Sequence, residues 1–190
     1  MSRHKNKIKV WDIFVRTFHW GIVVSFITAY VTSQSGMQIT HSYIGYLICT
    51  LLLARLVWGF VGSAYARFSN FPFSLSAALA YARQILKGTL AVYLGHNPTG
   101  SIMIYTFLVI LLTLCISGFI LLGGLEFEGP ALDLVGNFSD EVIYQISDLH
   151  QFCVDLMWFL VTLHVLGVIT ASLQHKDNLV KAMFTGYKKV

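Results

Sequence analysis

The sequence predicts an all-α integral membrane protein in which four transmembrane helices form one bundle. Of its 190 residues, 56% are hydrophobic and only 12% are charged, about half the charged fraction of an ordinary soluble domain. Four apolar segments approach or exceed the ~20 residues needed to cross ~30 Å of hydrocarbon. All but one of the 13 Lys and Arg residues lie at one end of these segments. Together these observations exclude a soluble globular protein.

The four predicted spans cover about residues 17–35, 41–62, 100–123 and 146–173. The first has the weakest signal, because it ends in Ser, Thr and Gln. Between the second and third spans, Pro72 interrupts the chain, and Ser74 or Ser76 can cap a helix over about 74–87. That helix is too short to span, so we expect it to lie along the membrane interface. No repeat or low-complexity linker occurs, and residues 1–190 are expected to form a single domain.

The basic residues predict the orientation. They lie before the first span, between the second and third, and after the fourth: Arg3, Lys5, Lys7, Lys9, Arg16, Arg67, Arg83, Lys87, Lys176, Lys181, Lys188 and Lys189. The positive-inside rule makes this side cytoplasmic and places both termini there. The loop 125–148 lies on the opposite side and is acidic. The pI near 9.0 follows from this bias and from contact with anionic lipids, so we expect no nucleic-acid partner.

Four histidines at matched depths predict two cofactor sites. His150 and His164 are 14 residues apart in the fourth span, which places them about 21 Å apart along one helix face. His41 begins the second span at the outer level, and His19 begins the first at the inner level. Depth therefore pairs His41 with His150 and His19 with His164. Each pair can offer two imidazole nitrogens to one iron on opposite faces of a porphyrin, an arrangement suited to one-electron transfer. Zinc is disfavoured, because each level supplies only two histidines.

Three further residues have positions that suit haem binding, and each also has an alternative interpretation that does not involve haem. Arg55 follows His41 by 14 residues and returns to the same face at the inner level, where it can clamp a haem propionate; alternatively it snorkels to the headgroups. Gly45 and Gly167 lie about one turn after His41 and His164, where a missing side chain lets a macrocycle approach. Ordinary small-residue helix packing is the alternative for both glycines. Asp155 lies about 140° around the helix from His150, and no role is assigned to it.

The three cysteines lie in apolar runs without a CxxC or CxxCH motif. Buried free cysteine behaves as a small hydrophobic residue. We therefore expect Cys49, Cys115 and Cys153 to be packing thiols.

The chain resembles the prokaryotic cytochrome b561 family and the related b-type subunits of nickel–iron hydrogenases and formate dehydrogenases. The resemblance covers nearly the whole chain. It is carried by VWDIFVRTFHW (10–20), HSYIGY (41–46), RLVWGFVGS (55–63), GHNPTGS (95–101), the histidine pair of the fourth span and the tail SLQHKDNLVKAMFTGYKK (172–189). It implies two b haems, with the ligand pairs that depth already suggests.

The resemblance also implies electron transfer between a periplasmic redox partner and the quinone of a bacterial inner membrane. In the formate dehydrogenase relatives, quinone binds beside an asparagine that precedes the third helix of the bundle, and Asn97 resembles that residue, although its spacing to Gly100 differs. His96 is next to it and has an ordinary pKa near neutrality, so we expect it to exchange protons with quinone. Alternatively, Asn97-Pro98 simply begins a helix.

Three functions remain open. The first is a di-haem electron carrier whose acidic loop 125–148 steers a lysine-rich partner, such as a c-type cytochrome. The second is a stand-alone superoxide:quinone oxidoreductase, which an acidic outer surface disfavours. The third is a membrane-anchor subunit of a hydrogenase or dehydrogenase complex. Whether the protein is itself an enzyme stays open.

Overall fold

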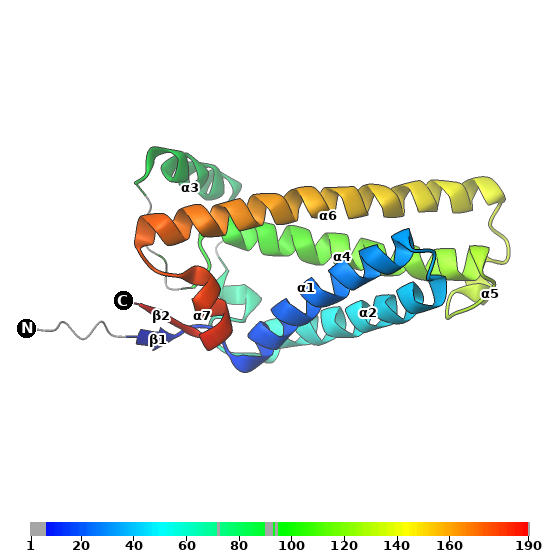
Figure 1. Cartoon of the computed structure of the whole chain (residues 1–190), viewed down its shortest axis with the longest axis horizontal. Helices are drawn as coiled ribbons and strands as arrows, with labels where there is room; N and C mark the ends of the chain where they lie inside the picture. Colours follow the sequence, from blue (N-terminus) through cyan, green and yellow to red (C-terminus); the bar gives the residue numbers. More distant parts are fainter. Residues whose placement is uncertain (1–6, 72, 90–92, 94, 190) are drawn as a thin grey trace, which may run out of the picture. The chain divides into compact units, whose positions relative to one another are not determined.

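A computed structural model describes residues 7–71, 73–89, 93 and 95–189. Arg3, Lys5 and Pro72, used above, lie outside these residues. The described chain is mostly helical (Figure 1). In chain order its elements are β1 (Lys7–Lys9), α1 (Ile13–Gln34), α2 (Gln38–Val61), the 3-10 turn η1 (Phe68–Asn70), α3 (Leu75–Lys87), α4 (Pro98–Leu125), α5 (Leu132–Val135), α6 (Asp140–His175), α7 (Leu179–Thr185) and β2 (Tyr187–Lys189).

The four long helices α1, α2, α4 and α6 are each long and apolar enough to cross a membrane. The prediction of an all-α, multi-pass membrane protein is therefore confirmed. All four helices begin before the predicted spans, most clearly α6, which begins at Asp140 and has 36 residues. Asp140 and Glu141 end the apolar run but favour a helix N-terminus electrostatically, so the helix starts before the hydrophobic segment. The predicted short helix before α4 is also present, as α3; its position at the interface stays a prediction.

The chain divides into two compact units, and each long helix contributes a segment to both. Unit 1 comprises residues 1–20, 54–106 and 160–190, and unit 2 comprises residues 21–53 and 107–159. Each unit is described below by itself. His19, Arg55, His96, Asn97 and His164 belong to unit 1, whereas His41 and His150 belong to unit 2.

In unit 1 the two ends of the described chain are joined. β1 pairs antiparallel with β2, with Ile8 opposite Lys188, and this small ribbon lies beside α7 in Figure 1. The amides of Val10 and Trp11 both donate to the carbonyl of Gly186. Gly186 has a φ of +86°, a left-handed conformation that ends α7 and favours glycine. The hydropathy pattern did not predict this ribbon.

In unit 2 aromatic side chains link neighbouring helices. Phe26 of α1 contacts Trp158 of α6, with ring centroids 5.3 Å apart, and Tyr46 of α2 lies 5.4 Å from Phe119 of α4. All four helix segments of this unit therefore take part in side-chain packing, as expected for a bundle in which sites lie between facing helices.

Candidate functional site

In unit 2 the structure brings His41 of α2 and His150 of α6 together. Their ring centroids lie 6.4 Å apart with an interplanar angle of 70°. Nδ1 of His41 is 2.9 Å from the backbone carbonyl of Ala29. A carbonyl only accepts hydrogen bonds, so Nδ1 carries the proton and Nε2 of a neutral ring keeps its lone pair. His41 is therefore held in the tautomer that binds a metal through Nε2.

His150 has a different Nδ1 partner. Its Nδ1 lies 2.8 Å from Oγ of Ser117 on α4, a residue that the sequence analysis did not identify. Ser117 also reaches the Thr113 carbonyl at 2.7 Å. No sequence signal distinguishes Ser117 from the other hydroxyl residues of apolar helices, because its relation to His150 arises only when α4 and α6 pack together.

In unit 1 the structure brings His19 of α1 and His164 of α6 together. Their ring centroids are also 6.4 Å apart, with an interplanar angle of 50°. Nδ1 of His19 is buried and makes no hydrogen bond to the described part of the chain. The depth pairing from the sequence thus corresponds to two spatial pairs, named below the 41/150 pair and the 19/164 pair.

The distance of 6.4 Å between the ring centroids in both histidine pairs can be compared with the distance expected for two imidazoles that bind one metal. An imidazole nitrogen binds a first-row metal at about 2.0–2.1 Å, which places the ring centre about 3.2 Å from the metal. Two imidazoles on opposite sides of one metal therefore have ring centres about 6.4 Å apart. Each pair has the spacing of two axial ligands and is too widely spaced for direct ring stacking.

Arg55 is buried and does not snorkel to a polar surface. Its side chain is 4% exposed, and its guanidinium lies 4.9 Å from the centroid of the Phe68 ring. Nη2 donates to the Ala66 carbonyl at 3.1 Å. Nη1 is buried and has no hydrogen-bond partner within the described residues. A buried guanidinium with an unused donor fits an anionic group such as a propionate.

Gly45 and Gly167 both border open space. A Cβ added at either position would meet no heavy atom of the described residues within 4 Å. Close helix–helix packing would place a neighbouring backbone or side chain against such a glycine. The alternative explanation is therefore disfavoured, and the open helix surface near His41 and near His164 fits a flat cofactor.

Asn97 has a clear structural role. Its Oδ1 accepts from the amide of Gly100 at 2.7 Å, so it caps α4, which begins at Pro98. Its side chain also hydrogen-bonds Tyr81 of α3, and Thr99 donates to the Ala78 carbonyl of the same helix at 3.0 Å. The GHNPTG motif thus begins α4 and attaches α3 to it.

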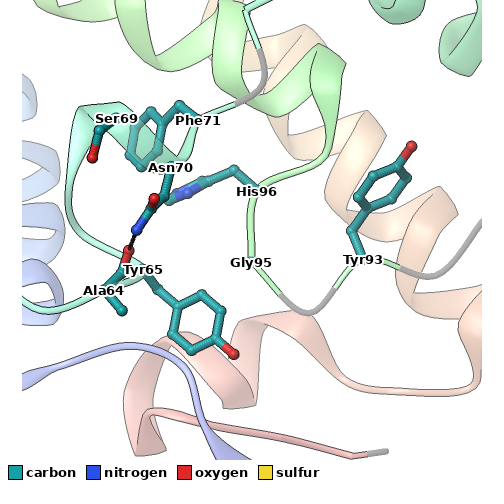
Figure 2. Close-up of a pocket in the computed structure, with 8 residues that line it drawn as sticks. All are labelled: Ala64, Tyr65, Ser69, Asn70, Phe71, Tyr93, Gly95 and His96. Carbon is teal, nitrogen blue, oxygen red and sulfur yellow. Dashed lines mark hydrogen bonds between the residues drawn. The ribbon is translucent and has the colours of Figure 1, made fainter.

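His96 lines a pocket of about 570 Å³ in unit 1 (Figure 2). The His96 pocket is lined by Ala64, Tyr65, Ser69, Asn70, Phe71, Tyr93, Gly95 and His96. Figure 2 shows His96 beside Phe71, and Asn70 hydrogen-bonded to Ala64. Asn97 is not among the lining residues. Of the two residues expected at a quinone site, only His96 faces this pocket.

The environment of His96 lowers its pKa, which disfavours a protonated ring near neutral pH. The ring lies between Phe71 and Trp11, with centroid distances of 4.2 and 4.7 Å. Burial lowers the pKa of His96 to about 3, assisted by the positive charges of Lys188 and Arg55. The expectation of a proton-exchanging His96 used the pKa of a solvated imidazole, and it stays a prediction. The lowered pKa favours the uncharged, hydrogen-bonding form of His96.

Asp155, which had no assigned role, is exposed on α6 and accepts a hydrogen bond from Gln151 at 3.0 Å.

Within the described residues, no cluster of three or more His, Cys, Asp or Glu is arranged to hold a metal ion. Four membrane-length helices thus define the class of protein, a multi-pass membrane protein, and the two imidazole pairs are its candidate cofactor ligands.

Comparison with known proteins agrees with this class. The family model of prokaryotic cytochrome b561 matches residues 10–186. The chain is 24% identical to a probable Ni/Fe-hydrogenase B-type cytochrome subunit of Azotobacter vinelandii, over 98% of this chain and 90% of that protein. It is 21% identical to the protein of the same description in Rhodobacter capsulatus, over 98% and 83%. It is 23% identical to that of Cupriavidus necator, over 94% and 86%. No solved structure matches the chain.

The chain therefore belongs to the prokaryotic cytochrome b561 family. It is a b-type cytochrome of the membrane, and the prosthetic group implied by the family is haem b. The resemblance drawn from the sequence motifs is confirmed.

Proposed function

We propose that the protein holds two b haems, one between His19 and His164 and one between His41 and His150, and transfers electrons across the membrane. The observation that carries this proposal is the 6.4 Å separation of both imidazole pairs, which equals the spacing of two axial ligands on one iron. Haem supplies one-electron chemistry, and two histidine ligands leave no open iron position for a substrate. The Nδ1 hydrogen bonds of the 41/150 pair further support ligation through Nε2.

The test is haem quantitation in the purified protein. A pyridine haemochrome assay should give two b haems per chain, falling to about one in His150→Ala and in His164→Ala. His175→Ala is the matched control, because His175 lies on the same helix, at its last residue, and is assigned no ligand role. Two haems retained in either ligand variant, or no haem in folded wild-type protein, would refute the assignment.

We infer that the protein is an inner-membrane protein with both termini in the cytoplasm, and that quinone exchanges electrons near the 19/164 pair. The His96 pocket is the best-supported place for a quinone headgroup, since it lies in unit 1 with that pair and has both aromatic and polar lining. A neutral His96 can hydrogen-bond a quinone carbonyl, whereas Asn97 is engaged in capping α4. His96→Phe should therefore impair quinone reduction and leave both haems bound; unchanged kinetics would remove this pocket from the proposal.

We also infer that a periplasmic redox partner docks on the acidic loop 125–148. Glu126, Glu128 and Asp133 are exposed, as is Phe127 at 75%. Charges of one sign around an exposed aromatic side chain fit a partner with a lysine-rich rim. Neutralising the three carboxylates should slow association with a c-type cytochrome at low ionic strength and reduce the salt dependence. An unchanged association rate would exclude the loop as the docking surface.

A second candidate is the membrane cytochrome subunit of a nickel–iron hydrogenase. The relatives are described as probable Ni/Fe-hydrogenase B-type cytochrome subunits, which favours this candidate, and electron transfer through the bundle would be the same. Mild-detergent purification distinguishes the two: a hydrogenase subunit should co-purify in constant ratio with a nickel-containing chain, whereas a free carrier should not. The superoxide:quinone alternative would require a superoxide-dependent reduction of haem that is fast in the absence of any protein partner.

A further inference from the structure

We propose that Ser117 is a positioning residue for His150, whose hydroxyl oxygen accepts the Nδ1–H hydrogen bond and thereby holds the ring with Nε2 ready to bind haem iron. This inference rests on the proposed function, in which His150 is an axial ligand. It extends that function by assigning a role to a side chain of α4, a helix that carries none of the four histidines.

The protons of this hydrogen-bond chain can be assigned individually. A serine hydroxyl has one proton to donate and two lone pairs to accept with. Ser117 Oγ lies 2.7 Å from the Thr113 carbonyl, which can only accept, so the hydroxyl proton is donated there. At 2.8 Å from His150 Nδ1, Oγ is then the acceptor and Nδ1 is the donor. Nε2 of the neutral ring is left unprotonated, as metal ligation requires.

Packing holds this arrangement in place. Ser117 is 3% exposed, so water does not compete for its hydroxyl. The neighbouring Gly118 brings the α4 backbone close to the ring, since an added Cβ would lie 3.6 Å from His150 Cε1. The imidazole is thus positioned by a hydrogen bond and by contact with the same turn of α4. Replacing the hydroxyl would leave a buried Nδ1–H without its acceptor.

The hydrogen bond also has an electronic consequence. An acceptor on Nδ1–H makes the imidazole a more basic ligand, which favours ferric over ferrous iron. Removing the acceptor should therefore raise the midpoint potential of the haem bound by the 41/150 pair. Loss of such a partner changes metal-site properties by about 10-fold or more, and a 10-fold change in the reduced-to-oxidised ratio is about 59 mV for a one-electron couple.

The decisive comparison uses two variants of equal shape. Ser117→Thr keeps the hydroxyl, and Ser117→Val replaces it by a methyl group in a side chain of the same size. Both are measured as haem-loaded protein by redox titration and by low-temperature EPR, whose low-spin signal responds to the orientation of the axial rings. We expect Ser117→Val to raise one of the two potentials by about 59 mV or more, the equivalent of a 10-fold change, and to shift one EPR signal, and we expect Ser117→Thr to resemble the wild type.

Thr50→Ala is the control for loss of a helix hydroxyl. Thr50 Oγ1 donates to the Tyr46 carbonyl at 2.9 Å, the same kind of bond that Ser117 makes to Thr113, but without a histidine partner among the described residues. The two haem midpoint potentials of Thr50→Ala should equal those of the wild type. Equal potentials and spectra in Ser117→Val and Ser117→Thr, or an equal shift in Thr50→Ala, would overturn the role of Ser117. Two haems retained in His150→Ala would instead overturn the proposed function.

Discussion

Asp12 illustrates how one side chain organises unit 1. Its Oδ1 accepts from the amide of Val15 at 2.8 Å and so caps α1. Its Oδ2 accepts from Trp58 Nε1 at 3.0 Å and from Ser63 Oγ, which connects the start of α1 with the end of α2. Burial by itself raises the pKa of Asp12, but these three hydrogen bonds together lower it below the usual value.

This lowered pKa predicts a pH-dependent contribution to stability. Because the pKa of Asp12 is lower in the folded state, its ionised carboxylate stabilises the folded protein. This stabilisation is complete above the unfolded-state pKa of about 3.9 and is lost as the pH falls through the folded-state pKa. At pH 7, Asp12→Ala should reduce the free energy of unfolding by about 1–3 kcal/mol, because it leaves buried donors unsatisfied. Thermal unfolding in detergent, compared at pH 7 and pH 3, should show the difference shrinking at acidic pH.

The exposed Asp133 provides the control for this experiment. Asp133→Ala should change the melting temperature little at either pH, since it removes no buried partner. If Asp12→Ala lost the same amount of stability relative to the wild type at both pH values, the charge of the carboxylate would not be the cause of that loss.

At the residue scale the sequence predicted which histidines lie together, 41 with 150 and 19 with 164, but it predicted the surroundings of the site residues poorly. The four histidines were identifiable because imidazoles are rare in apolar spans and because a 14-residue interval returns to the same helix face. Ser117 was not identifiable, since its position opposite His150 depends on how α4 packs. The lowered pKa of His96 was not predictable for the same reason, since two aromatic rings bury the ring and two cations from other segments lie close enough to lower its pKa further.

Among the helices, the contact between α2 and α4 in unit 2 is testable through native cysteines. Cys49 and Cys115 are free thiols placed closely enough to hydrogen-bond. Treatment with copper phenanthroline should oxidise the two thiols to one intramolecular disulfide, detected by mass spectrometry of the digested protein. Cys153→Ser should not affect this product, whereas Cys49→Ser should abolish it. Failure to form the bond in the Cys153→Ser protein would contradict this packing of α2 against α4.

Helix α6 carries a second prediction at the same scale. Asp155 is an exposed carboxylate within an otherwise apolar span, and such a residue near a helix centre costs about 2.5–3.5 kcal/mol on insertion, whereas Leu is favourable. Asp155→Leu should therefore lower the apparent insertion free energy of the isolated α6 segment by about 3 kcal/mol, measured by glycosylation of inserted segments in microsomes. Asp140→Leu, at the helix start, should have a much smaller effect. Equal effects would place Asp155 outside the hydrocarbon region.

Hydropathy identified the long helices and α3 because these elements depend on local composition. It underestimated the length of α6, because the helix continues through acidic residues outside the apolar run. It missed the β1–β2 ribbon because the pairing joins residues from opposite ends of the chain, which no local pattern encodes. The orientation inferred from the basic residues stays a prediction.

For the molecule as a whole, the two proposed haem sites differ in their electrostatic surroundings. Arg55 is the one buried charged side chain among the described residues, and it belongs to unit 1 with the 19/164 pair. A positive charge in the same unit favours the reduced, less positive form of the haem proposed there. In unit 2, both imidazoles of the 41/150 pair have a hydrogen-bonded Nδ1, which favours the oxidised state. We therefore expect the higher potential at the 19/164 site, which has the buried Arg55 charge in its unit and a His19 Nδ1 that makes no hydrogen bond to the described residues.

Redox titration can assign the two potentials directly. His150→Ala should retain the haem of higher potential, and His164→Ala the haem of lower potential. Arg55→Gln should lower only the higher potential, because it removes the buried charge of unit 1, while Arg83→Gln, at an exposed arginine on α3, should change neither. This order of potentials makes electron transfer from the 41/150 site to the 19/164 site favourable, which would carry electrons from a periplasmic donor toward quinone. The reverse order would instead favour quinol oxidation, with the periplasmic partner acting as electron acceptor.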